Sequence, residues 1–94
     1  MPYYVYILYS ESLDTYYKGQ TSDLDDRIKR HNHKQEKATQ SGVPWKLVWF
    51  TEKATRSEAV ILERKIKNLS RKRTIEFINK NTQGVAGPDV TPGA

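Results

Sequence analysis

The stretch Tyr3-Tyr4-Val5-Tyr6-Ile7-Leu8-Tyr9 decides the fold of this 94-residue chain. Aromatic and branched aliphatic side chains fill it, on both of the faces that alternate along a strand. A strand with one face in water alternates apolar and polar residues, whereas a strand covered on both faces does not. The pattern therefore predicts a central strand over residues 3–9, with another layer of structure on each side.

Two further strands are predicted from similar short runs. A polar turn at residues 10–15 precedes Tyr16-Tyr17-Lys18-Gly19-Gln20, so the first two strands form a hairpin. The third strand is Trp45-Lys46-Leu47-Val48-Trp49-Phe50. Residues 32–44 are mostly polar, and we expect them to form a loop.

The first helix is predicted directly after the hairpin. The hydroxyl of Ser22, with Asp25 three residues on, is typical of a helix N-cap. The spacing that follows places three side chains on one helical face, namely Leu24, Ile28 and His31. Arg27 and His31 form an i, i+4 pair on the same helix.

Two more helices complete the predicted domain. Thr55-Arg56-Ser57-Glu58 is a capping box, and it opens a helix with one apolar stripe, Ala59, Leu62, Ile66 and Leu69. Ser70 is expected to cap a last helix that carries Ile75 and Ile78. The sequence thus predicts an α+β domain over residues 1–81, a small three-stranded antiparallel sheet flanked by three helices in the order β-β-α-β-α-α. Residues 82–94, with three glycines and two prolines, are predicted to be a disordered tail.

The composition excludes several classes of protein. The chain has no cysteine, which rules out a disulfide framework, a thiolate zinc site and a cysteine nucleophile. The two histidines, His31 and His33, are too few for a histidine metal cage. No apolar run approaches the roughly 18–20 residues of a membrane span, and no basic and apolar leader opens the chain. We therefore expect a cytoplasmic protein without a membrane partner.

Positive charge is concentrated in one part of the chain. There are 16 Lys and Arg against 11 Asp and Glu, a net charge of +5. No acidic residue lies between Arg64 and Arg73, and this block holds six basic residues, Arg64, Lys65, Lys67, Arg71, Lys72 and Arg73. Such a block attracts polyanions, although a solvated helix face is the alternative interpretation.

Two tyrosines and an arginine are candidates for chemistry. All six tyrosines lie within the first 17 residues, and cross-strand packing explains most of them. If the hairpin pairs as predicted, the phenols of Tyr6 and Tyr17 project toward Arg27. Arg27 is a planar, permanent cation suited to a phosphate. Its plainer interpretation is a surface ion pair with Asp23 or Asp26.

Glu63, His31 and Gly19 each have two or more interpretations. Glu63 borders the apolar stripe, where it fits either an i, i+4 ion pair with Lys67 or an anchor for a divalent cation. His31 is a candidate general acid or base, a phosphate donor, or a helix histidine that only faces its neighbour. Gly19 either ends a strand or allows a substrate to approach the protein backbone closely.

Taken in order, these residues resemble the signature of the GIY-YIG nuclease family. The matching pieces are Tyr4-Val5-Tyr6, Tyr17-Lys18-Gly19-Gln20-Thr21, Leu24-x-x-Arg27-x-x-x-His31-Asn32, Pro44-Trp45-x-Leu47-Val48 and Ala59-x-x-x-Glu63-x-x-Ile66-Lys67. They span residues 3–79 and look like the small stand-alone members, relatives of the nuclease half of the bacterial excision-repair incision subunit. The resemblance implies an endonuclease that hydrolyses phosphodiester bonds, with DNA as the expected substrate and RNA as the alternative.

The resemblance also implies a role for each motif residue. Tyr6 and Tyr17 become the motif tyrosines, one of which is the general base for a water that attacks phosphorus in line. Arg27 stabilises charge on the phosphoryl oxygens, and His31 takes a position often filled by His or Tyr. Glu63 holds one divalent cation, Mg²⁺ or Mn²⁺. A phenol with a free pKa of about 10 serves as a base only near cations, so we expect these side chains to be neighbours.

Substrate binding is predicted to rest on phosphate contacts, which carry no sequence information. The expected contacts come from Lys18, Gly19, Lys29, Arg30, Lys67, Arg71, Lys72 and Arg73. Lys18 replaces the second motif isoleucine and is expected to expose its charge, whereas Gln20 replaces a lysine of the excision-repair relatives. No appended binding domain fits in 94 residues, so a protein partner is a candidate source of specificity. The alternative function is a non-catalytic nucleic-acid-binding module with the same fold and a basic helix face.

Overall fold

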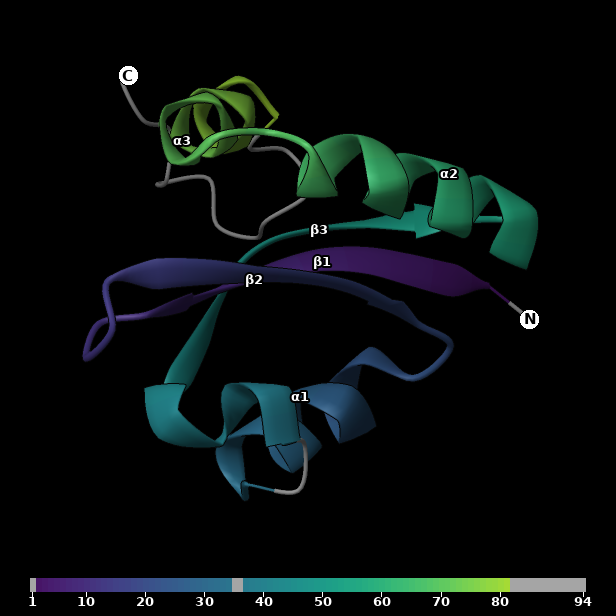
Figure 1. The fold of residues 1–94 in the computed structure, drawn as a ribbon. Coiled ribbons are helices and arrows are strands. Elements are labelled where there is room, and N and C mark those ends of the chain that lie inside the picture. Colours follow the sequence, from purple (N-terminus) through teal and green to yellow (C-terminus); the bar gives the residue numbers. More distant parts are fainter. Residues whose placement is uncertain (1, 35–36, 82–94) are drawn as a thin grey trace.

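Strands β1 (Tyr3–Ser10), β2 (Thr15–Thr21) and β3 (Trp45–Lys53) form one antiparallel sheet in the order β2-β1-β3 (Figure 1). The computed structural model describes residues 2–34 and 37–81. The central position predicted for β1 is confirmed, because its residues Val5, Ile7 and Leu8 are fully buried. The sequence of a central strand that is covered on both faces is a continuous run of mostly apolar residues, and the sequence of β1 has this pattern.

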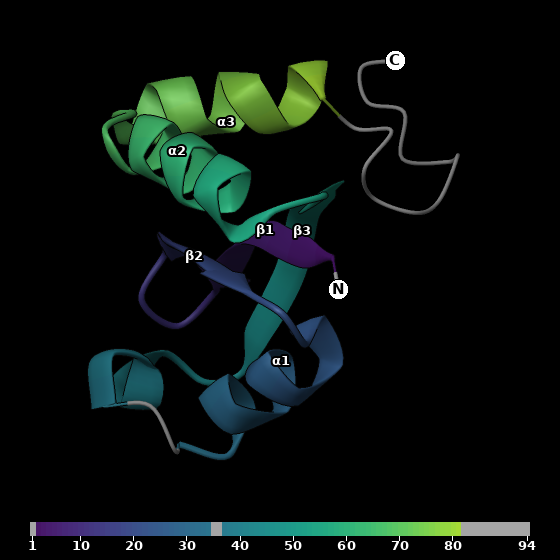
Figure 2. The ribbon, with the colours of Figure 1, turned by 90° about the vertical axis from the view of Figure 1, so that its right-hand side faces the viewer.

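Helices cover both faces of this sheet (Figures 1 and 2). Helix α1 (Leu24–Asn32) lies on one face, which we call the α1 face, and α2 (Arg56–Lys67) and α3 (Arg71–Lys80) lie on the other, the α2 face. Alternation along β1 divides the core accordingly. The α1-face cluster is built on Tyr6, Leu8 and Trp45, and the α2-face cluster on Val5, Ile7, Trp49, Ala59 and Ile66. The predicted α+β fold and element order are confirmed.

The helix starts follow local hydrogen bonding, with one correction. Thr55 and Glu58 form the predicted capping box in both directions, and Ser70 caps α3. The N-cap of α1 is Asp23, however, not Ser22. The carboxylate of Asp23 accepts a hydrogen bond from the backbone N–H of Asp26 at 3.1 Å, and Asp caps a helix as well as Ser does.

The expected loop at residues 32–44 is wrong in one respect, because it contains a 3₁₀ helix, η1 (Lys37–Gly42). Polar, short 3₁₀ helices leave no apolar periodicity in a sequence. The segment is nevertheless anchored, because the indole N–H of Trp45 donates to the carbonyl of Thr39 at 2.8 Å. Thr39 and Gly42 are both buried.

A β-bulge allows β3 to contribute neighbouring side chains to the hydrophobic clusters on both faces of the sheet. The β1–β3 register shifts between Ile7 and Leu8, so that Ile7 lies opposite Trp49 and Leu8 opposite Leu47. The extra residue, Val48, packs with Trp49 on the α2 face, while Leu47 packs on the α1 face. An inserted residue shifts the alternation of the strand in this way.

None of the helices within residues 2–34 and 37–81 is long and apolar enough to cross a membrane. The tail predicted for residues 82–94 lies outside the described residues.

Candidate active site

Tyr6 and Gly19 face each other across the β1–β2 ladder and form the floor of the candidate site. The phenol of Tyr6 lies directly over the α-carbon of Gly19. A Cβ at Gly19 would come within 2.6 Å of Tyr6 Oη and 2.8 Å of Tyr6 Cζ. Gly19 lies inside β2 and does not end it, so the expected strand-ending turn is wrong. The group that approaches Gly19 closely in the structure is the phenol of Tyr6, and the predicted approach of a substrate stays a prediction.

We therefore expect Gly19→Ala to destabilise the domain by about 1–3 kcal/mol, the usual effect of forcing an extra methyl group into a packed site. Urea unfolding followed by tryptophan fluorescence measures the change. The matched control is Gln20→Ala, at the next position of β2, where the side chain becomes smaller. An unfolding midpoint for Gly19→Ala equal to that of the unmodified protein would contradict the packing of Tyr6 against Gly19.

His31 joins the two motif tyrosines. Its Nε2 lies 3.0 Å from Tyr6 Oη, in a buried hydrogen bond. Its ring lies 5.0 Å from the ring of Tyr17, measured between centroids. The structure thus brings Tyr6, Tyr17 and His31 together on the α1 face. The phenols were expected to point toward Arg27; instead the Tyr6 phenol bonds the residue one turn further along α1.

The two tyrosines differ in their access to water. Tyr6 is 1% exposed, and its hydroxyl is committed to His31. Tyr17 is half-buried, and its hydroxyl has no hydrogen-bond partner among residues 2–34 and 37–81. In that part of the chain no buried side-chain N or O atom lacks a partner, so solvent must reach the Tyr17 hydroxyl. Tyr17 is therefore the motif tyrosine that a water molecule or a substrate can touch.

Arg27 lies on α1 one turn before His31 and is half-buried. The acids expected to neutralise it are used elsewhere. Asp26 pairs with Arg30 at 3.0 Å, and Asp23 caps the helix. Within the described ranges Arg27 forms no ion pair, so the plainer interpretation of this residue is wrong. A half-buried guanidinium without a carboxylate partner is a ready site for an external anion.

Glu63 lies on α2, the helix that packs over β1 and β2 on the α2 face. Its side chain is 16% exposed, and its carboxylate pairs with Lys67 Nζ at 3.2 Å. The ion-pair interpretation is thus confirmed. The structure places this residue on the helix layer opposite the one that carries Arg27 and His31.

The donor set fits a weakly held divalent cation. No group of three or more His, Cys, Asp or Glu side chains able to hold a metal exists among the residues described. Mg²⁺ commonly uses one or two carboxylates and completes its shell with waters and substrate phosphates. Glu63 offers one such carboxylate, and Lys67, which is 53% exposed, is free to move away from it. Glu63 is the residue of this chain that would hold the ion.

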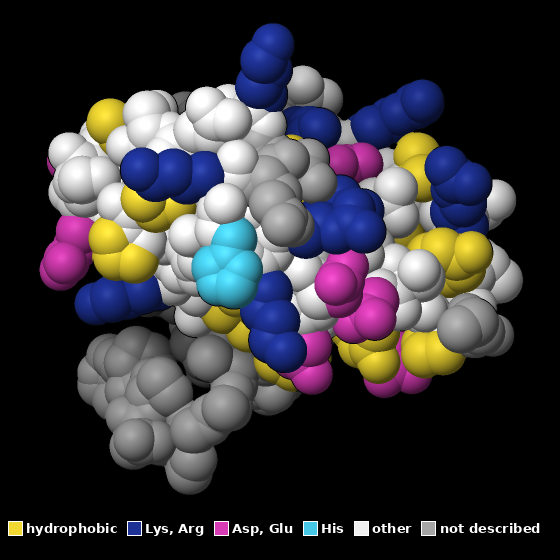
Figure 3. Space-filling model, turned by 90° about the horizontal axis from the view of Figure 1, so that it is seen from below, with side chains coloured by type: hydrophobic (Ala, Val, Ile, Leu, Met, Phe, Trp, Pro, Cys, Tyr) yellow, Lys and Arg dark blue, Asp and Glu magenta, His cyan; other side chains and the backbone are white. Residues whose placement is uncertain are grey.

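The predicted phosphate-binding residues divide into two groups. Arg30, Lys67 and Arg71 are engaged in ion pairs, with Asp26, Glu63 and Asp14 respectively. Lys29, Lys72 and Arg73 are exposed and have no ion-pair partner within residues 2–34 and 37–81. Seen from the α1 side, Lys and Arg side chains alternate with Asp and Glu and form no continuous basic patch (Figure 3).

Lys18 corrects another expectation. It is half-buried, and its Nζ donates to the carbonyl of Leu69 at 3.4 Å, at the end of α2. Burial lowers the pKa of Lys18 below its usual value. The charge predicted to be exposed on β2 therefore points to the α2 face, because side chains alternate along a strand and Tyr17 occupies the other face.

Arg71 has a structural partner that the sequence did not reveal. Its guanidinium donates to the carboxylate of Asp14 at 2.8 Å and lies over the ring of Tyr16. Tyr9 donates to the same carboxylate at 2.6 Å. Hydrogen bonds from Tyr9 and Arg71 lower the pKa of Asp14. The cluster ties the β1–β2 turn to the start of α3, with a residue separation too long for any local pattern to show.

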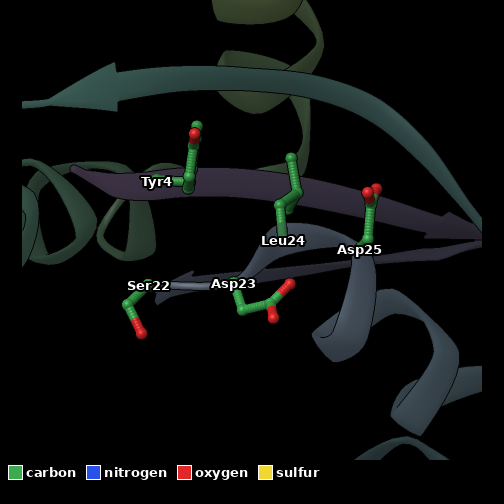
Figure 4. A pocket seen from close by; sticks show the side chains of 5 residues that line it. All are labelled: Tyr4, Ser22, Asp23, Leu24 and Asp25. Carbon is green, nitrogen blue, oxygen red and sulfur yellow. The ribbon is translucent and has the colours of Figure 1, made fainter. Parts of the chain in front are cut away.

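A hollow of about 260 Å³ lies near the start of α1 but does not belong to this site (Figure 4). It is lined by Tyr4, Ser22, Asp23, Leu24 and Asp25. Two carboxylates border it, so it repels phosphates. None of the candidate catalytic residues lines it, neither Tyr6, Tyr17, Arg27 and His31 nor Glu63.

Comparison with known proteins decides the family. Residues 2–76 match the GIY-YIG catalytic domain. The chain belongs to the GIY-YIG family. This family of nucleases was the one that the motif residues resembled, and the match covers every candidate catalytic residue from Tyr6 to Glu63.

Small GIY-YIG proteins of similar length are among the relatives. The chain is 35% identical over 80 residues to UPF0213 protein BH0048 of Halalkalibacterium halodurans, covering 84% of each chain. It is 36% identical over 80 residues to UPF0213 protein CPE1444 of Clostridium perfringens, covering 84% of this chain and 85% of the relative. The solution NMR structure of UPF0213 protein BH0048 from Bacillus halodurans superimposes with a TM-score of 0.60 at 34% identity, over 97% of this chain and 93% of that one.

Sequence reasoning missed Thr39 and the role of Asn32. Thr39 Oγ1 lies 2.8 Å from His31 Nδ1, in a buried hydrogen bond. The Asn32 side chain pairs with the backbone of Trp45, accepting from its N–H at 2.6 Å and donating to its carbonyl at 3.2 Å. The position of Asn32 beside His31 in the motif was the only available signal.

Proposed function

We propose that this chain is a metal-dependent endonuclease that hydrolyses phosphodiester bonds in DNA. The observation that carries the proposal is the half-buried, ion-pair-free guanidinium of Arg27, one helical turn before His31, whose ring packs at 5.0 Å against the ring of the solvent-reached Tyr17. An anion site beside a hydroxyl that water can reach suits a reaction in which water attacks a phosphate. Membership of the GIY-YIG family supports the same class of chemistry.

Tyr17 is the proposed general base. The oxygen of a water molecule forms a new bond to phosphorus, its proton passes to the Tyr17 phenolate, and the bond from phosphorus to the 3′ oxygen breaks. The leaving oxygen takes its proton from solvent. Tyr17 enters this step as the phenolate, its own proton having passed to solvent.

Arg27 binds the non-bridging oxygens of the phosphate and stabilises the charge that develops on them. A planar guanidinium with two parallel N–H donors suits this contact. Glu63 lies on the other face of the sheet from Arg27, so a divalent cation held there would supply Lewis-acid polarisation to a phosphate that reaches past the edge strand β2. Tyr6 and His31 keep Tyr17 in place, because the rings of both residues pack against its ring at 6.4 and 5.0 Å between centroids.

The test uses the purified full chain with labelled duplex, single-stranded and flap DNA and with RNA, each in Mg²⁺, Mn²⁺ or EDTA. We expect cutting of DNA that requires a metal, together with a 20-fold or greater loss in Tyr17→Phe and a smaller loss in Tyr16→Phe, in line with the usual size of a general-base contribution. Tyr16 is the control because it neighbours Tyr17 but packs on the α2 face. A gel shift without cutting would overturn the nuclease proposal in favour of a binding module, and cutting of RNA alone would overturn the choice of DNA.

A further inference from the structure

Three buried side chains from three different elements form a continuous hydrogen-bonded chain on the α1 face. Tyr6 Oη on β1 lies 3.0 Å from His31 Nε2 on α1, and His31 Nδ1 lies 2.8 Å from Thr39 Oγ1 on η1. Tyr6 is 1% exposed, and His31 and Thr39 are fully buried. Buried polar groups are costly without partners, so the directions of these two hydrogen bonds are fixed by chemistry and not by solvent.

The chemistry of the groups decides which way the hydrogens point. A neutral imidazole donates from one nitrogen and accepts at the other. Of the three hydrogen-bonded groups, a phenol, a neutral imidazole and an aliphatic hydroxyl, the phenol is the strongest acid, with a free pKa of about 10, and an imidazole nitrogen is its best acceptor. Tyr6 O–H therefore donates to His31 Nε2, and the hydrogen of the imidazole stays on Nδ1. Thr39 must then accept from Nδ1–H, as a hydroxyl oxygen can while it donates elsewhere.

We propose that Thr39 is a positioning residue of the candidate site, and that its hydroxyl holds His31 in the neutral tautomer with hydrogen on Nδ1. In this state the unprotonated Nε2 accepts a hydrogen bond from the Tyr6 phenol, and the ring has one fixed orientation. Which nitrogen of a histidine carries the hydrogen is set in general by the partner of the other nitrogen.

The backbone around Thr39 is built to keep this hydroxyl in place. The carbonyl of Thr39 accepts a hydrogen bond from the Trp45 indole at 2.8 Å. The side-chain amide of Asn32 in turn forms two hydrogen bonds with the backbone of Trp45. Gly42, which ends η1, lies so close to the Trp45 ring that a Cβ there would overlap it. Thr39 is thus fixed relative to both α1, which carries His31 and Asn32, and β3, which carries Trp45.

The effect of Thr39 on catalysis rests on the proposed nuclease function, whereas the tautomer assigned to His31 does not depend on that function. The His31 ring is one of three aromatic rings against which Tyr17 packs, and its centroid lies nearer to the Tyr17 ring than those of Tyr6 and Trp45. If the ring is free to turn or to exchange tautomers, the hydroxyl of Tyr17 loses its fixed position. Thr39 touches neither substrate nor water in this scheme and acts through His31 alone.

Nitrogen-15 NMR of histidine-labelled protein tests the tautomer directly, because the chain has only two histidines and the exposed His33 serves as an internal reference. In the unmodified protein we expect a protonated Nδ1 and an unprotonated Nε2 for His31 at neutral pH. Thr39→Ser should keep this pattern, and Thr39→Val, which has the same shape without the acceptor, should shift it toward hydrogen on Nε2 or toward a mixture. The matched control is Thr74→Val, an equally buried threonine whose hydroxyl donates to Ser70 within α3.

Hydrogen on Nε2 or on both nitrogens of His31 in the unmodified protein would overturn the proposal, and this measurement needs no variant to fold. An unchanged tautomer in folded Thr39→Val would overturn it as well. In the cleavage assay we expect Thr39→Val to lower kcat roughly 10–100-fold, the range seen when the partner orienting a functional histidine is removed. KM should stay within about twofold, since the phosphate contact at Arg27 is unchanged, and Thr39→Ser should restore kcat. Absence of cutting in every variant would refute the nuclease function while leaving the tautomer result to stand.

Discussion

Arg27→Ala is expected to lower kcat for phosphodiester cleavage by about 10²–10³-fold, the usual loss when one donor to a developing negative charge is removed. The reason lies in how Arg27 is held. It is half-buried on α1, and neither Asp23 nor Asp26 neutralises it, because one caps the helix and the other pairs with Arg30. Its charge is therefore available to a phosphate. Single-turnover cleavage of a labelled DNA substrate measures the loss.

Arg30→Ala is the matched control, because it removes the same side chain three residues along the same helix. Arg30 is about half exposed and paired with Asp26, and exposed pairs of this spacing contribute only about 0.3–0.5 kcal/mol. We expect its kcat to change by less than threefold. Arg27→Lys tests geometry, since lysine keeps the charge but loses the planar pair of donors; it should recover only part of the rate. Equal losses in the Arg27 and Arg30 variants would mean that the helix contributes general positive charge and no specific phosphate contact.

The fold was predictable from the sequence because local patterns and the tertiary structure agree. The apolar run at residues 3–9 required a strand buried on both faces, and β1 is that strand. The capping box at Thr55 and the apolar stripe of α2 were each readable within about fifteen residues. A fold can be predicted from one sequence when the local preferences of its segments agree with the tertiary structure in this way.

The candidate site was predictable only in part. The motif shows which residues belong to the site, but it does not show which face of the sheet each side chain points to. Strand alternation alone separates Tyr17 from Lys18, yet the sequence did not reveal that Lys18 turns to the end of α2. The sequence did not single out Thr39 for a different reason. It lies in a short 3₁₀ helix without apolar periodicity. The role proposed for it depends on a hydrogen bond to the buried imidazole of His31, eight residues earlier in the sequence.

Contacts between distant segments account for the remaining differences. Arg71 was grouped with a basic block by its neighbours in sequence, but its partner Asp14 is 57 residues away. Glu63 was expected beside the tyrosines, and it lies on α2, in the helix layer on the other face of the sheet from α1. No spacing rule predicts on which face of a sheet a later helix will pack.

Glu63→Gln is expected to reduce metal-dependent cutting on the order of 10³-fold, because a cation that polarises a phosphate contributes several kcal/mol and each 1.36 kcal/mol is tenfold in rate. Glutamine keeps the size of the side chain and removes its charge, so the fold should persist. The lost partner in the i, i+4 ion pair, Lys67, is 53% exposed, and we expect its loss to change stability little. Calorimetric titration with Mn²⁺ and the cleavage rate against metal concentration measure the effect.

Lys67→Ala provides the opposite perturbation at the same carboxylate. Because the ammonium of Lys67 lies 3.2 Å from the Glu63 carboxylate, its removal should leave that carboxylate free and raise the apparent affinity for Mn²⁺. Glu76→Gln, an exposed acid on α3, is the charge-matched control and should change neither affinity nor rate. If Glu63→Gln binds Mn²⁺ and cuts as the unmodified protein does, the cation is held elsewhere. In that case the arrangement of Glu63 and Lys67 is an ordinary surface ion pair, and the phosphate chemistry would have to rest on Arg27 and Tyr17 alone.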